Sequence, residues 1–107
     1  MFNFLEINQK NPWKQFWLNV ENNNQTLRNY CESGLYDEVL KIITEGKNGY
    51  PAEVNSKGLD DWRPLHFCSY EGYDDVAELL IKHGADVNAY TRFNRNALHI
   101  ASIRGFL

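Results

Sequence analysis

The chain lacks the features of secreted, membrane-spanning and metal-binding proteins. Its first residues combine neither a basic start nor a long apolar run, so they do not form a secretory signal. No stretch approaches the roughly 18 apolar residues of a membrane span. Only two cysteines are present, and no second Cys or His pair stands at zinc spacing. We therefore expect no membrane insertion, no metal and no cofactor.

Motifs of common enzymes are missing as well. No Gly-x-Ser-x-Gly elbow occurs, and Gly46-Lys47 has no glycine five residues before it, so it is not a phosphate-binding loop. The paired carboxylates Asp60-Asp61 and Asp74-Asp75 point to different faces and cannot easily share a substrate. We expect no enzyme activity and no small-molecule substrate.

Charge of one sign is also missing. Lysine and arginine number 11 against 14 aspartate and glutamate residues, a net charge of -3. Such a balance does not single out nucleic acid or an anionic membrane as partner. The 107 residues suffice for one domain near the lower size limit of a self-supporting core.

What the chain does contain is an internal repeat with a period of 33 residues. Arg63-Pro64-Leu65-His66-Phe67-Cys68 recurs as Asn96-Ala97-Leu98-His99-Ile100-Ala101, and the same shift matches Gly72 with Gly105. Together with the run Gly-Ala-Asp-Val-Asn at 84–88, this period and these motifs resemble the ankyrin repeat. The resemblance covers the chain from about residue 25 onward.

The resemblance implies an all-α solenoid of stacked helix-turn-helix units with projecting hairpin loops. We expect about two and a half repeats preceded by an N-terminal cap helix. The segments are 1–24 with the cap helix, 25–53 as a degenerate first repeat with an insertion, 54–86 as the second repeat and 87–107 as a truncated third.

Helix boundaries in the second and third repeats follow from local signals. We expect helices at Pro64 to Glu71, Asp74 to His83 and Ala97 to Arg104, separated by turns at Gly72 and Gly84. Apolar residues expected to face the core of the second repeat are Leu65, Phe67, Cys68, Val76, Leu79, Leu80 and Ile81.

The N-terminal segment carries its own helical pattern. Trp13, Phe16, Trp17 and Val20 recur at helical spacing after Pro12, which predicts an amphipathic helix over roughly 12 to 22 that ends in a loop at 22–24. We interpret it as a cap over the apolar flank of the first repeat. The alternative is a docking helix that inserts two tryptophans into a partner groove. Residues 1–11 are too short to classify.

The third repeat has a first helix and no second one. Leu98, Ile100, Ile103 and Phe106 should therefore be incompletely covered. We interpret the polypeptide as a fragment, a truncated product, or a subunit whose end is covered by another copy. Self-association through this repeat is one of the expected partnerships.

The cysteines and histidines are expected to be structural. Cys31 and Cys68 occupy equivalent core positions, which favours reduced thiols over a disulfide and a cytoplasmic location, with the nucleus as an alternative. The resemblance implies that His66 and His99 are structural, with one ring nitrogen bonded to the adjoining hairpin so that the loop is fixed to the helix. That role is preferred over catalysis or metal binding because it recurs with the repeat.

The family's usual protein-binding surface is the concave face, formed by the hairpin tips and the exposed side of the first helices. Carrying those contact positions onto this chain gives Leu59, Asp60, Trp62, Tyr70 and Glu71 in the second repeat, and Tyr90, Arg92, Phe93, Arg95, Ile103 and Arg104 in the third. Aromatic residues and arginine dominate interface energetics. The alternative is that several of them fold back over the chain itself.

The function expected from the resemblance is non-catalytic protein binding. Trp62, Tyr70, Tyr90 and Phe93 would anchor the partner, while Arg92 and Arg95 would select an acidic surface. Single-stranded nucleic acid is disfavoured, because acidic residues near these arginines oppose a phosphate backbone. The alternative function is an N-terminal regulatory or targeting fragment of a longer ankyrin-containing enzyme or channel.

Overall fold

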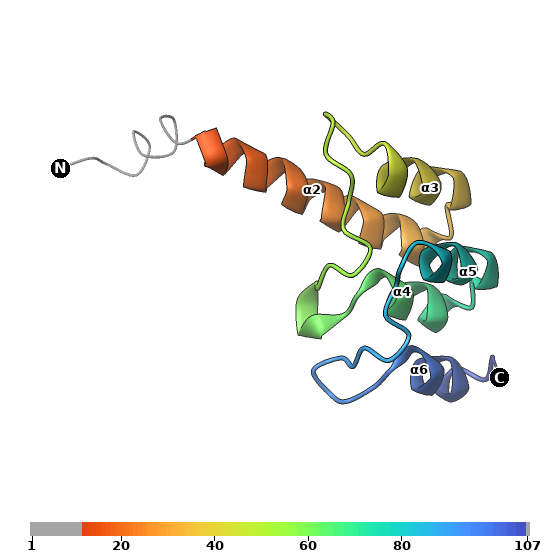
Figure 1. The fold of residues 1–107 in the computed structure, drawn as a ribbon. Helices are drawn as coiled ribbons and strands as arrows, with labels where there is room; N and C mark the ends of the chain where they lie inside the picture. Colours follow the sequence, from red (N-terminus) through yellow and green to blue (C-terminus); the bar gives the residue numbers. More distant parts are fainter. Residues whose placement is uncertain (1–11, 107) are drawn as a thin grey trace.

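The computed structural model describes residues 12–106, which form helices joined by loops (Figure 1). The elements are α2 (Pro12–Ser33), α3 (Tyr36–Thr44), the 3-10 turn η1 (Leu59–Asp61), α4 (Pro64–Glu71), α5 (Asp74–Lys82) and α6 (Ala97–Ile103). Within this part of the chain the only extended pairing is a single bridge between Lys47 and Tyr50. No helix of the described residues is both long and apolar enough to cross a membrane. The predicted all-α fold is confirmed.

The helices form two rows that run along the stack. The C-terminal half of α2, then α4, then α6 make an inner row, in which each helix contacts the next (Figure 1). An outer row consists of α3 and α5, which contact each other and their partners α2 and α4. Each helix pair leaves one apolar side that only the neighbouring pair can bury, so the layers stabilise one another.

The core lies between these rows and is continuous across the layers. Its fully buried apolar side chains are Leu27, Cys31, Val39, Cys68, Val76 and Leu80. Leu65 and Leu79 complete the second layer with little remaining exposure. Full burial of a Leu or Val side chain contributes about 1.5–3 kcal/mol, so a few of these contacts decide the stability of a chain of this length.

An aromatic ring from the next layer packs against the turn between the two helices of each pair. Gly34 and Gly72 have φ angles of 70° and 81°, in the left-handed region that favours glycine. A Cβ atom on Gly34 would lie 2.9 Å from the Tyr73 ring, and one on Gly72 would lie 2.9 Å from the Phe106 ring. The repeat is therefore visible as a glycine–aromatic contact that recurs between layers.

Local signals placed the helix ends correctly to within a residue. Helix α4 has the predicted bounds, α5 ends one residue early at Lys82, and Gly84 follows with a φ of 95°. At the start of α6 the Asn96 side chain accepts a hydrogen bond from the His99 amide at 2.9 Å. Arg63, at the same position before α4, makes no such side-chain bond. Asparagine caps a helix and arginine does not.

The predicted loop at 22–24 is wrong, because α2 continues through it to Ser33. The cap helix and the first helix of the first repeat are one rod. Asparagine has a modest helix propensity, but Asn23 and Asn24 are buried and bonded to a distant loop. Tertiary contacts therefore override the local preference.

That distant loop is the insertion of the first repeat. The Asn23 amide donates to the carbonyl oxygens of Lys47 (3.0 Å) and Tyr50 (2.5 Å). The Asn24 side-chain carbonyl oxygen accepts from the Glu53 backbone amide at 2.7 Å. Between these anchors the chain turns at Asn48 and Gly49, with φ angles of 54° and 78°. The inserted residues are thus held against α2 by its two buried asparagines.

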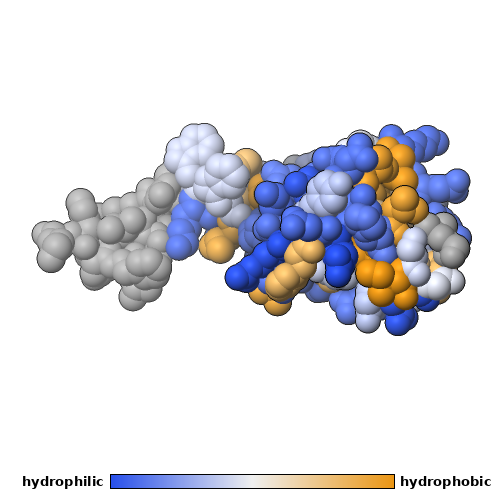
Figure 2. All heavy atoms as spheres, turned by 90° about the horizontal axis from the view of Figure 1, so that it is seen from below, coloured by the Kyte–Doolittle hydropathy of each residue, from blue (hydrophilic) through white to orange (hydrophobic). Residues whose placement is uncertain are grey.

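Two predictions about individual apolar side chains are also wrong. Ile81 is 46% exposed, because it lies on the side of α5 that faces solvent. Ile100 is only 4% exposed, because α6 packs against α4. Leu98, Ile103 and Phe106 are incompletely covered, as predicted. Figure 2 views the molecule from the α6 end and shows apolar side chains gathered there beside polar ones.

Candidate partner-binding site

The eleven predicted contact residues lie in two hairpin tips and on the exposed sides of α4 and α6. We call this surface the inner face. Its exposed members are Leu59, Tyr70, Tyr90, Arg92, Phe93, Arg95, Ile103 and Arg104, and its half-buried members are Asp60, Trp62 and Glu71.

The two hairpin tips are tied to each other. The Arg92 backbone amide donates to the Asp60 carbonyl oxygen at 2.8 Å. The Arg92 guanidinium also lies 3.5 Å from the Asp60 carboxylate. Asp60 and Asn94 have φ angles of 56° and 60°, which these two residue types tolerate better than most. Neighbouring tips therefore hold a fixed spacing.

The second tip is closed from the inside by a buried threonine. The Thr91 backbone amide donates to the Arg95 carbonyl at 2.9 Å. Its hydroxyl oxygen accepts from the backbone amides of Phe93 and Arg95, each at 3.3 Å. Phe93, 63% exposed, is carried on this turn and points away from the core. The hairpin presents an aromatic side chain on a hydrogen-bonded frame.

Trp62 is packed against its own layer. Its ring centroid lies 5.3 Å from that of Phe67, 5.8 Å from Tyr70 and 6.0 Å from His66. Such edge and tilted contacts stabilise aromatic clusters. The alternative of residues folding back over the chain therefore describes Trp62 well, and its half-buried ring is a support for the inner face.

Arg104 forms a column with two aromatic rings. Its guanidinium carbon lies 4.5 Å from the Tyr70 ring centroid and 5.8 Å from that of Phe106. Its Nε–H donates to the Tyr70 carbonyl oxygen at 3.0 Å. Phe106 was absent from the predicted set, although its equivalence to Tyr73 after 33 residues signals a packed aromatic. Tyr70, Arg104 and Phe106 are brought together at one end of the inner face.

His66 is a buried tie from helix to hairpin. Its Nε2–H donates to the Ala89 carbonyl oxygen at 3.0 Å, and its Nδ1 accepts from the Arg63 amide at 2.9 Å. Burial lowers the pKa of His66, the bond to Ala89 opposes this, and the Arg63 charge lowers the pKa further. Within residues 12–106, His99 repeats only the Nδ1 bond, which it accepts from the Asn96 backbone amide at 3.3 Å. The structural role predicted for His66 is confirmed.

Neither cysteine is placed for nucleophilic chemistry. Cys31 and Cys68 are both free and fully buried. Burial raises the pKa of the Cys31 thiol and raises that of Cys68 to about 12. Both therefore stay protonated at neutral pH, and, as predicted, both are free thiols in the core. Among residues 12–106, no three His, Cys, Asp or Glu side chains are grouped closely enough to hold a metal ion.

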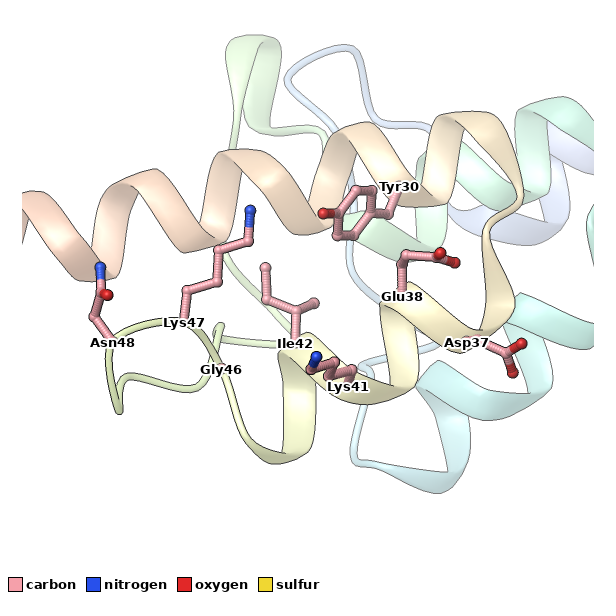
Figure 3. A pocket seen from close by; sticks show the side chains of 8 residues that line it. All are labelled: Tyr30, Asp37, Glu38, Lys41, Ile42, Gly46, Lys47 and Asn48. Atoms are coloured by element: carbon pink, nitrogen blue, oxygen red, sulfur yellow. The ribbon is translucent and has the colours of Figure 1, made fainter.

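A second concave surface lies at the opposite end of the stack, between α2, α3 and the inserted loop. This cleft has a volume of about 530 Å³. Tyr30 comes from α2, Glu38 and Lys41 from α3, and Lys47 from the loop (Figure 3). The Lys47 Nζ lies 5.9 Å from the Tyr30 ring centroid. Two lysines and two carboxylates line the cleft, so it favours no ligand of a single charge.

The N-terminal half of α2 extends beyond the stack and carries the two tryptophans (Figure 1). Trp13 and Trp17 are exposed, and a shallow cavity of about 440 Å³ lies beside them. Phe16 packs edge-on against Trp17 and against Tyr50 of the inserted loop, at 5.1 and 5.3 Å. The apolar stripe of α2 is therefore divided: Phe16 covers the first repeat as a cap does, and the tryptophans face outward.

Comparisons with known proteins agree with the repeat pattern. A family model described as ankyrin repeats (3 copies) matches residues 15–107. Oxysterol-binding protein-related protein 1 from Homo sapiens is 35% identical over 69 residues, which is 60% of this chain and 7% of that protein.

Two further relatives are named as regulators of other proteins. Protein phosphatase 1 regulatory subunit 12A from Mus musculus is 31% identical over 74 residues, covering 67% of this chain and 7% of the relative. NF-kappa-B inhibitor cactus from Drosophila melanogaster is 36% identical over 52 residues, covering 48% and 10%. The chain spans a tenth or less of the length of these three relatives.

Proposed function

Since this chain belongs to the ankyrin repeat family, whose repeats are a module for protein–protein interaction, we propose that it binds a partner protein through its inner face without catalysing a reaction. Support for the absence of catalysis comes from the buried, protonated thiols and from a histidine engaged on both ring nitrogens.

One observation carries the choice of surface. Tyr90 and Phe93 are 53% and 63% exposed, and they lie on one hairpin that the buried Thr91 holds in place. Folding alone does not require large aromatic side chains at such positions. Aromatic anchors on a rigid frame bind well because little conformational freedom is lost when the partner arrives.

The roles proposed for individual residues follow from their contacts. Trp62 supports Tyr70 from beneath and is not itself the principal anchor. Arg92 already faces the Asp60 carboxylate, so its charge is partly neutralised. Tyr90, Phe93 and the side chains around Arg104 are the groups left to contact a partner.

The proposal is tested with two matched double variants. Tyr90→Ala with Phe93→Ala removes exposed aromatic surface from the inner face. Tyr36→Ala with Ile81→Ala removes exposed apolar surface from the outer row. Partner capture from cell extract, measured by quantitative mass spectrometry, should fall for the first variant and stay at the wild-type level for the second. Equal capture by all three proteins would contradict the proposal, provided their melting temperatures agree.

A salt titration on the captured partner separates protein binding from nucleic-acid binding. Association with a nucleic acid weakens steeply with salt, because phosphate contacts release counterions. An interface of Tyr90 and Phe93 should respond mildly. A steep salt dependence that disappears after nuclease treatment would favour nucleic acid.

The runner-up proposal is that the chain is the regulatory or targeting part of a longer protein. The relatives named as a phosphatase regulatory subunit and an NF-kappa-B inhibitor support it. In that case the inner face would contact the domain that is regulated, in the cytoplasm or the nucleus. Transcript sequencing together with the mass of the endogenous protein tests this proposal, which fails if both correspond to a chain of 107 residues.

A further inference from the structure

We propose that Arg104 is a preformed receptor for one carboxylate of the partner, so that the inner face takes an extended peptide in which an Asp or Glu is flanked by apolar residues. This inference rests on the proposed function and specifies the chemistry of its partner.

Contacts within the chain hold Arg104 in place. Its Nε–H donates to the Tyr70 carbonyl oxygen at 3.0 Å, and its guanidinium carbon lies 4.5 Å from the centroid of the Tyr70 ring. A long, flexible side chain normally loses rotamer freedom when it binds. Here two contacts already restrict it, so less freedom remains to be lost when a ligand arrives.

The rest of the guanidinium is available. Among the residues that the structure describes, no acceptor bonds either terminal nitrogen of Arg104, and the two ion pairs found there involve Arg28 and Arg92. Guanidinium and carboxylate groups match as two parallel N–H···O bonds. The Arg104 side chain is therefore held in place while the N–H donors of its two terminal nitrogens can bind a carboxylate.

The other arginines of the inner face lack one of these two properties. Arg92 has a carboxylate partner in Asp60, 3.5 Å away. Arg95 is exposed, and no side-chain contact fixes it among residues 12–106. Arg104 alone of the three combines a held guanidinium with unpaired terminal nitrogens, which makes Arg95 the natural control for loss of charge.

The surroundings of Arg104 favour an apolar neighbour for the ligand carboxylate. Ile103, Tyr70 and Phe106 are all exposed beside it. The 3-10 turn before α4 carries Asp60 and Asp61, which would oppose a chain of phosphates along the inner face but tolerate a single carboxylate. An acidic residue next to a Leu, Ile or Phe fits this combination.

The experiment uses the full chain and a phage-displayed library of random 12-residue peptides. Enriched peptides are synthesised, and their affinities are measured by fluorescence polarisation. We expect enriched peptides to share an Asp or Glu beside an apolar residue. Arg104→Gln should weaken their binding about tenfold to a hundredfold, the usual range for a hydrogen bond to a charged group.

Two controls separate a fork from a simple charge. Arg95→Gln removes the same charge elsewhere on the inner face and should weaken binding less than Arg104→Gln does, because no contact holds the Arg95 guanidinium in place. Arg104→Lys keeps the charge without the planar fork and should bind nearly as weakly as Arg104→Gln. Replacing the acidic residue of the peptide by its amide should cause no further loss on Arg104→Gln, because the contact is already gone.

The outcomes distinguish the two claims. Peptides that lose binding on Phe93→Ala but not on Arg104→Gln would overturn the carboxylate inference and leave the inner face as the binding surface. Enriched peptides without an acidic residue, or equal losses on Arg95→Gln, would overturn it as well. If the enriched peptides lose binding on neither Phe93→Ala nor Arg104→Gln, or none is enriched at all, both the inference and the proposed function fail. Thermal melts show that each variant is folded.

Discussion

Asn23 should be a stabilising residue even though it lies in the middle of a helix. Its amide donates to the Lys47 and Tyr50 carbonyl oxygens, and its side chain is buried. Asn23→Ala removes both bonds. The Lys47 carbonyl oxygen still accepts from the Tyr50 backbone amide at 3.0 Å, whereas the Tyr50 carbonyl oxygen loses its Asn23 donor.

The expected magnitude follows from opposing terms. Leaving the partly buried Tyr50 acceptor unsatisfied costs about 1–3 kcal/mol, and alanine returns roughly 0.5 kcal/mol through its better helix propensity. Asn23→Ala should therefore lower the free energy of unfolding by about 0.5–2.5 kcal/mol, which for a chain of this size lowers Tm by roughly 2–20 °C.

The neighbouring Asn22 is the matched control. It is exposed, and its side chain makes no hydrogen bond to the described residues. Asn22→Ala should stabilise the protein by about 0.5 kcal/mol, the opposite sign. Urea unfolding followed by circular dichroism measures both midpoints and slopes. If Asn22→Ala and Asn23→Ala shift the midpoint in the same direction, the asparagines do not anchor the inserted loop and this account of α2 is refuted.

Three further predictions concern pH, turn geometry and thiol chemistry. Because the folded pKa of His66 lies below the unfolded value of about 6.5, its contribution to stability is complete above that pH and falls as pH drops, by at most about 1.4 kcal/mol per pH unit; His66→Asn should remove this part of the dependence in denaturant titrations from pH 4.5 to 8. Gly72→Ala should destabilise more than Gly84→Ala, since both have positive φ but only a Cβ at 72 would meet the Phe106 ring; equal losses in urea unfolding would contradict the glycine–aromatic contact. Cys68, buried with a raised pKa, should resist a thiol reagent at pH 8 until denaturant is added; rapid labelling of the native protein would show that the core opens.

The parts of the fold that were predictable from sequence depend on local signals. Proline at the start of α4 and glycines at Gly72 and Gly84 mark helix ends within a few residues of chain, and the structure follows them. His66 was interpretable because its role recurs with the period, and its bond to Ala89 has the expected form.

The parts that failed depend on contacts far apart in sequence. The local sequence around Asn23 favours a loop, and only its bond to the Lys47 carbonyl oxygen, 24 residues away, explains why it lies in a helix. In the same way the contact of Arg104 with the Tyr70 carbonyl spans 34 residues, and no local pattern predicts it.

The most direct test of the inner face is an NMR titration. Uniformly ¹⁵N-labelled chain is titrated with a peptide enriched in the display experiment, and amide shifts are mapped onto the helices. The account predicts that the largest changes fall at Tyr90, Phe93 and Arg104, with Tyr36 and Ile81 in the outer row unmoved. Changes confined to α3 and α5, or to the cleft around Lys41 and Lys47, would contradict it.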